Sequence, residues 1–144
     1  MKSTLALAAA AASTLFTTGC IVVGDTVDPG DPLDAHLLLE WETVDSFTNV
    51  ALDCYSVGAD TVRVTARNSS TGKTYVDLFN CDDLAGVTYP LTAGDYYVNV
   101  DLASCGPEPD CPFPVILSAA SMVGPIGVWD DADYDLGLFI FLVD

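Results

Sequence analysis

Cysteine is the residue type with the clearest chemistry in this chain, which has five cysteines among 144 residues. Four of them lie at positions 54, 81, 105 and 111, and in an oxidising compartment four cysteines can form two disulfides in three alternative pairings. The segment from Cys105 to Cys111 is rich in Gly and Pro and brings its ends together, while Cys54 and Cys81 bracket a predicted hairpin. We therefore predict the disulfides Cys54–Cys81 and Cys105–Cys111. A zinc site made of the same four thiolates is the weaker alternative, because the chain has no C-x-x-C pair.

A second group with metal-binding chemistry is the acidic cluster Asp130, Asp131, Asp133 and Asp135. Calcium prefers several carboxylate oxygens, and alternating acids in a loop can converge on one ion. The cluster does not match an EF-hand loop, because Leu136 stands at the glycine position and Leu142 replaces the bidentate glutamate. We expect a solvated turn between the last two strands, with a calcium site as the alternative, and we predict no other metal or cofactor.

Catalytic chemistry has few candidates here. His36 is the only histidine, so a Ser-His-Asp or Cys-His device would depend on that one ring, and we expect a surface histidine instead. Pairs of acids carry no specific signal in a chain with 21 of them. The sequence also lacks a Gly-rich phosphate loop and a His-rich metal motif. We therefore predict no catalytic residue and no enzyme, and a hydrolase that uses loop carboxylates is the weakest alternative.

The first twenty residues have the layout of an export signal. Lys2 provides a positive start, residues 5–16 are mostly apolar, and Gly19 and Cys20 follow shortly afterwards. This segment resembles the bacterial lipobox, although Thr17 stands where that family usually has Leu. The resemblance implies cleavage after Gly19 and attachment of diacylglycerol to the thiol of Cys20, which becomes the new N-terminus.

Two further observations favour lipidation over the alternatives. The apolar run of about 12 residues is shorter than the roughly 20 that a transmembrane helix needs. If Cys20 instead remained a free thiol, the protein would be secreted with an odd cysteine, whereas lipidation leaves four to pair. By resemblance to Gram-negative lipoproteins, Ile21 in place of Asp lacks the inner-membrane retention signal, which implies the outer membrane.

The predicted organisation is a signal peptide over residues 1–19, a lipidated N-terminus with a flexible acidic linker over 20–34, and one domain over 35–144. All 21 acidic residues and three of the four basic ones follow Cys20, so the mature part carries a net side-chain charge of −18. This charge argues against nucleic acids as partners and against direct docking on anionic lipids. We expect membrane contact through the lipid on Cys20, and a protein partner in the envelope or outside the cell.

Short alternating runs predict the secondary structure. Residues 61–67 alternate between apolar and polar side chains, 73–80 return as the second strand of a hairpin, and 96–102 form a third strand. Weaker candidates are residues 35–43, 114–120, 124–129 and 136–143. About seven strands predict an all-β fold, a single antiparallel β-sandwich. The large aromatic side chains expected to pack in or near its core are Trp41, Phe79, Tyr96, Trp129, Phe139 and Phe141.

The region from Cys54 to Tyr96 is similar to immunoglobulin-like and carboxypeptidase-regulatory-like modules of secreted bacterial proteins. The resembling elements are residues 59–64 between the two cysteines and the Ala-Gly-Asp-Tyr turn at 93–96. This resemblance implies a module that binds, spaces or stabilises. We therefore expect a noncatalytic cell-envelope lipoprotein that displays a structural, adhesion or protein-interaction domain. The alternative is a surface module that binds calcium or a small ligand through loop 130–135.

Overall fold

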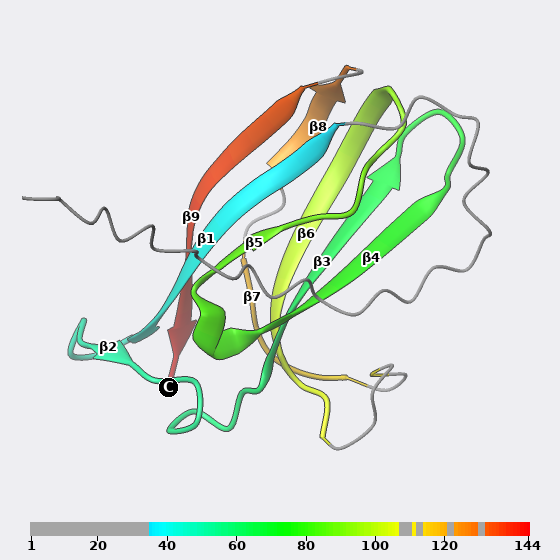
Figure 1. Ribbon diagram of the computed structural model, residues 1–144. Coiled ribbons are helices and arrows are strands. Elements are labelled where there is room, and N and C mark those ends of the chain that lie inside the picture. Colours follow the sequence, from blue (N-terminus) through cyan, green and yellow to red (C-terminus); the bar gives the residue numbers. More distant parts are fainter. Residues whose placement is uncertain (1–34, 107–110, 112–113, 121–122, 130–131) are drawn as a thin grey trace, which may run out of the picture.

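Two β-sheets packed face to face make up the fold (Figure 1). The computed structural model describes residues 35–106, 111, 114–120, 123–129 and 132–144. Within those ranges there is no α-helix, and one short 3-10 turn, η1 (Cys81–Asp83), follows the fourth strand. The predicted all-β sandwich is therefore confirmed.

The first sheet is built around its longest contact, between the first strand and the last. It contains β1 (His36–Asp45), β2 (Ala51–Leu52), β5 (Ala85–Val87) and β9 (Asp133–Val143). β9 runs parallel to β1 along the whole length of β1. On the other side of β1, β2 and β5 pair antiparallel with its two halves. The predicted antiparallel sandwich therefore contains one parallel pair, formed by two strands that lie far apart in the sequence.

The second sheet has β3 and β6 at its centre. Its strands are β3 (Thr61–Asn68), β4 (Thr74–Asn80), β6 (Gly94–Ser104), β7 (Val115–Ala119) and β8 (Val123–Val128). All pairs are antiparallel in the order β4, β3, β6, and β8 and β7 pair with successive halves of β6 on its free side. The seven predicted strands are all present within a few residues, and β2 and β5 bring the number in the described residues to nine.

The core lies between the sheets and follows from the period of two along each strand. β1, β3 and β6 contribute alternating side chains that are at most 3% exposed: Leu37, Leu39, Trp41, Val62, Val64, Ala66, Val98, Val100 and Leu102. On the outer face of the second sheet, Arg63 and Asp101 are register partners and form an ion pair at 2.7 Å. Of the six aromatic side chains predicted for the core, five are buried. The prediction for Trp129 is wrong, because this residue follows the end of β8 and is 70% exposed.

A β-bulge in β9 decides which of its side chains reach the core. The register with β1 shifts between Leu38 and Glu40, opposite Gly137, which has a φ of +77° that other residues rarely adopt. Beyond the bulge, Phe139 and Phe141 point inward opposite Trp41 and Thr43 of β1. The extra residue thus brings both phenylalanines into the core.

Both predicted disulfides are present. Cys54–Cys81 joins the segment after β2 to the turn after β4, with 5.9 Å between the Cα atoms, and both residues are buried. Cys105–Cys111 joins the end of β6 to the chain before β7, with a Cα separation of 4.9 Å. The first disulfide therefore crosses between the two sheets, whereas the second closes a local loop.

We expect Phe141→Ala to lower the free energy of unfolding by about 3–5 kcal/mol, since its fully buried ring fills the core. Leu142→Ala on the same strand is the control and should cost less than about 1 kcal/mol, because Leu142 is 56% exposed. Urea unfolding at constant pH measures both values. Equal losses in the two variants would contradict the inward register that Gly137 sets.

Candidate functional site

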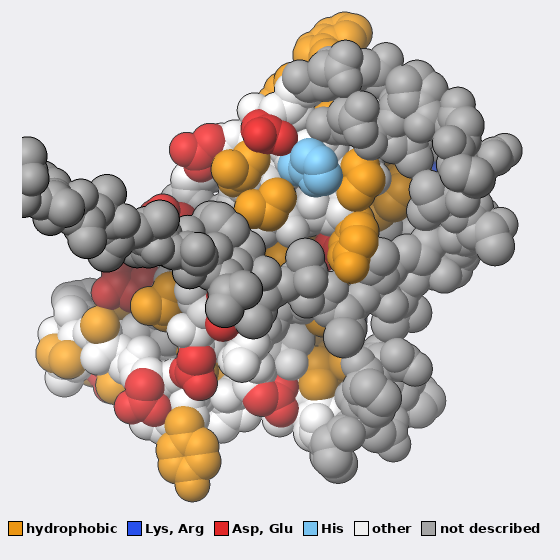
Figure 2. Space-filling view, in the orientation of Figure 1, with side chains coloured by type: hydrophobic (Ala, Val, Ile, Leu, Met, Phe, Trp, Pro, Cys, Tyr) orange, Lys and Arg blue, Asp and Glu red, His pale blue; other side chains and the backbone are white. Residues whose placement is uncertain are grey.

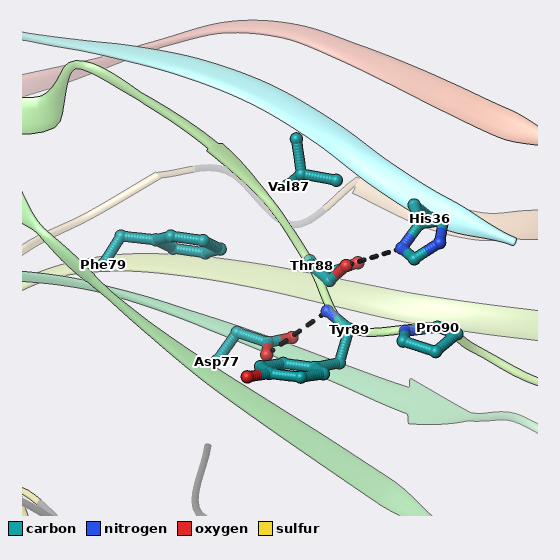
Figure 3. A pocket seen from close by; sticks show the side chains of 7 residues that line it. All are labelled: His36, Asp77, Phe79, Val87, Thr88, Tyr89 and Pro90. Atoms are coloured by element: carbon teal, nitrogen blue, oxygen red, sulfur yellow. Dashed lines mark hydrogen bonds between the residues drawn. The ribbon is translucent and has the colours of Figure 1, made fainter. Parts of the chain in front are cut away.

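A cavity of about 270 Å³ lies between the two sheets, beside His36 and Asp77 (Figure 3). β1 contributes His36, β4 contributes two residues, and β5 with the segment after it contributes the rest. The complete lining is His36, Asp77, Phe79, Val87, Thr88, Tyr89 and Pro90. The cavity opens to the surface, where Figure 2 shows His36 in pale blue with hydrophobic side chains beside it.

Hydrogen bonds to β1 and to Ala35, the residue before it, hold the wall formed by residues 87–91. The Thr88 backbone N–H donates to the Leu37 carbonyl at 3.0 Å, and the Leu91 N–H donates to the Ala35 carbonyl at 2.8 Å. The Thr88 hydroxyl accepts from the Leu37 N–H at 3.0 Å. His36 Nδ1 donates to the Thr88 carbonyl at 2.8 Å, so the ring is fixed by the wall that it faces. The expected surface histidine is in fact half-buried and lines a cavity.

Phe79 forms the inner side of the cavity because Gly86 leaves room for its ring. A Cβ at Gly86 would lie 2.7 Å from two ring carbons of Phe79, which is closer than such atoms approach. The ring also packs on Trp41, with 5.7 Å between centroids. The cavity is thus bounded by the aromatic part of the core.

Asp77 is the unusual residue of this site, because its carboxylate faces inward. On β4 it lies between Tyr75 and Phe79 on the face that is directed toward the core, and it is only 6% exposed. The Tyr89 N–H donates to its Oδ1 at 3.4 Å (Figure 3). Burial raises the pKa of Asp77 from 3.8 to about 6, while the bond from Tyr89 and the nearby His36 act in the opposite direction.

The lining of the cavity has the chemistry to hold a small molecule. An apolar hollow with one buried carboxylate and one fixed imidazole can orient a small molecule that has an apolar part and a hydrogen-bond donor. No serine or cysteine is among the described residues that line it. The sequence alone did not indicate this site, because residues 73–80 have apolar side chains on both faces, and Val76 and Leu78 could equally have pointed inward.

The predicted calcium cluster is only partly described. Asp130 and Asp131 lie outside the described residues, while Asp133 and Asp135 are exposed and belong to β9, which begins three residues earlier than predicted. Asp135 Oδ1 accepts from the Gly137 N–H at 2.8 Å, next to the bulge. The described part of the chain holds no group of three or more His, Cys, Asp or Glu side chains that could bind a metal ion.

Another acidic side chain, Asp60, holds the loop of the second disulfide. Its carboxylate accepts from the N–H groups of Cys105 at 2.8 Å and Gly106 at 3.0 Å, and from the Thr61 hydroxyl at 2.8 Å. Burial alone would raise the pKa of Asp60, but these hydrogen bonds outweigh it and the pKa is lowered. A polar cavity of about 280 Å³ adjoins this loop. The carboxylate therefore holds the beginning of this loop, at Cys105 and Gly106, beside the start of β3.

The outer face of β9 carries a row of exposed apolar side chains. Leu138, Ile140 and Leu142 are 53%, 52% and 56% exposed. Their register partners on β1 are Glu40, Glu42 and Val44. We call these three residues of β9 the outer row, and it combines apolar side chains with neighbouring carboxylates.

The predicted signal peptide, Cys20 and the linker lie outside the described residues. Among the described residues, no helix is long and apolar enough to cross a membrane. Comparison with protein-family models, with curated proteins and with solved structures finds no match to this chain.

The raised pKa of Asp77 predicts a specific dependence of stability on pH. Between about pH 4 and 6 the folded state keeps a proton that the unfolded state releases, so this contribution is complete below 3.8 and is lost as the pH rises through about 6. Asp77→Asn removes the titration. We expect its free energy of unfolding, relative to the wild type, to increase by on the order of 2–3 kcal/mol from about pH 4 to 7.

Urea unfolding at several pH values measures this difference, and Asp82→Asn controls for the loss of one exposed carboxylate. The control should differ from the wild type by a nearly constant amount. Parallel curves for Asp77→Asn and the wild type would contradict the raised pKa.

Proposed function

We propose that this protein is a noncatalytic cell-envelope lipoprotein whose immunoglobulin-like sandwich acts as a protein-interaction module. The observation that supports this function most directly is the outer row of β9. Soluble domains usually expose apolar side chains singly, whereas a contiguous apolar surface often marks an interaction site. Three aliphatic side chains in a row, each more than half exposed, fit a surface that a partner covers.

The edge of β9 supports the same function. β1 occupies one side of this strand, and among the described residues no strand pairs with the other side. Close to its end, the Ser118 hydroxyl donates to the Leu142 carbonyl at 3.0 Å, so β7 lies beside only this part of the edge. A long edge strand without Lys or Pro is open to pairing with an extended segment of another protein.

The charges around the outer row indicate what such a partner would carry. Glu40 and Glu42 lie beside Leu138 and Ile140, and the part of the chain after Cys20 has only three basic residues. A second copy of so acidic a domain would be repelled. We therefore propose an extended partner segment that combines apolar residues with Lys or Arg.

A photo-crosslinking residue placed at Ile140 in intact cells tests this surface, with Tyr97 on the outer face of the second sheet as the control position. We expect a protein adduct from Ile140 that Tyr97 does not form. Reversing two charges with Glu40→Lys and Glu42→Lys should abolish it, because the variant repels a basic segment. Reversing the exposed Asp82 and Asp83 in the same way is the matched control and should leave the adduct unchanged.

Failure to form an adduct at Ile140 would contradict the proposed surface. Equal effects of the two pairs of charge reversals would also contradict it, because adduct formation would then depend only on the net charge of the domain.

Lipid attachment at Cys20 would bring this domain to the outer membrane. The tripartite N-terminal segment and the odd number of cysteines support it. The two disulfides use the other four cysteines, which leaves Cys20 as the one available thiol. Since single acyl chains bind membranes only marginally, a lipid with at least two chains is needed for a stable anchor.

The intact mass of protein extracted from native membranes, before and after reduction and alkylation, tests the anchor. We expect a chain that begins at lipid-modified Cys20, with four thiols that react only after reduction. Cys20→Ala should abolish both the lipid mass and the membrane fraction. A mass that retains Met1, or that contains no lipid, would contradict the proposed anchor.

A further inference from the structure

The cavity beside His36 and Asp77 has the features of a site for a positively charged small molecule. It is lined mainly by apolar side chains, yet it contains one carboxylate that is 6% exposed. We propose that this cavity binds a small organic amine, with the ammonium group at Asp77 and an apolar body against Phe79, Val87 and Pro90. This site is separate from the outer row of β9 and does not depend on the proposed protein partner.

The contacts of Asp77 favour a cationic ligand. A buried carboxylate is costly unless it is paired or strongly hydrogen-bonded. The bond that it accepts from the Tyr89 N–H measures 3.4 Å, which is longer than the usual 2.7–3.2 Å. An ammonium group would donate short, charge-assisted hydrogen bonds to the same carboxylate. Because the pKa of Asp77 is about 6, the carboxylate is ionised at neutral pH.

The protein's own basic side chains leave this position to a ligand. Arg63 is paired with Asp101, and the Lys73 ammonium lies 5.0 Å from the centre of the Tyr75 ring. Among the described residues that line the cavity there is no Lys or Arg. His36 Nδ1 donates to the Thr88 carbonyl, so this hydrogen bond directs that nitrogen to the backbone.

Shape and charge restrict the ligand further. A volume of about 270 Å³ is slightly below the usual range of small-molecule sites, about 300–1,000 Å³, so the amine should carry one ring or a short alkyl chain. Phe79 provides an aromatic wall, and Val87 and Pro90 add apolar side chains to the lining (Figure 3). The strongly negative domain raises the local concentration of cations and so favours an amine over an anion or a neutral molecule.

Binding of benzylamine to the mature protein, measured by calorimetry and by amide NMR shifts at about pH 7.5, tests the proposal. We expect saturable binding that shifts the amide signals of Thr88 and Tyr89. Benzyl alcohol, which has the same ring without the charge, should bind at least about tenfold more weakly, a difference of about 1.4 kcal/mol. Asp77→Asn should weaken benzylamine by a similar factor and leave benzyl alcohol unchanged, while Asp82→Asn should affect neither.

The affinity for benzylamine should also fall as the pH decreases through about 6, because Asp77 becomes neutral. The other titratable groups that line the cavity are His36 and Tyr89. Benzyl alcohol should show no such dependence.

A second variant, Val87→Trp, keeps the carboxylate and fills the cavity from an exposed position on β5. It should abolish the binding of both probes while the unfolding midpoint stays close to that of the wild type. Equal affinities for benzylamine and benzyl alcohol, undiminished amine binding in Asp77→Asn, or the absence of shifts at Thr88 and Tyr89 would each overturn the proposal.

Discussion

The contact of Trp41 with the end of β4 is the interaction on which the sandwich most depends. Its indole N–H donates to the Cys81 carbonyl at 2.7 Å, and its ring packs on Phe79. Because Trp41 belongs to the first sheet and Phe79 to the second, this buried contact joins the two layers. Cys81 is also bonded to Cys54, which ties the segment after β2 to the same point. Phe79 also lines the cavity, so the cavity is bounded by one of the two rings that join the layers.

Local patterns in the sequence were sufficient to predict most strands and both disulfides. Residues 61–67 and 96–102 alternate so regularly that a half-buried strand is the best interpretation, and their inward side chains are buried as predicted. The pairing of Cys105 with Cys111 follows from the short Gly- and Pro-rich segment between them. The two-residue β2 and three-residue β5 could not be predicted in this way, because so few residues show no period.

Features that depend on distant parts of the chain were not predicted. The parallel pairing of β1 with β9 joins residues about one hundred positions apart, and no local pattern gives its direction. The cavity likewise combines His36 of β1, Asp77 of β4 and the segment after β5, which meet only when the sheets pack. Trp129 is of a residue type that is usually buried, but its position after the end of β8 leaves it exposed. Residue type alone therefore overestimated the core and did not locate the site.

The bulge at Gly137 links the stability of the domain to its proposed interaction surface. Side chains of a strand alternate between its faces, so the shift that turns Phe139 and Phe141 inward also turns Leu138, Ile140 and Leu142 outward. Residues 138–142 of β9 are apolar on both faces of the strand. In a sandwich of two sheets, only one face of a strand can be buried within the domain. Exposure of the outer row promotes aggregation, whereas the high negative charge of the domain opposes self-association. A partner segment with apolar and basic residues would fit both features, since it would cover the outer row and neutralise the adjacent carboxylates.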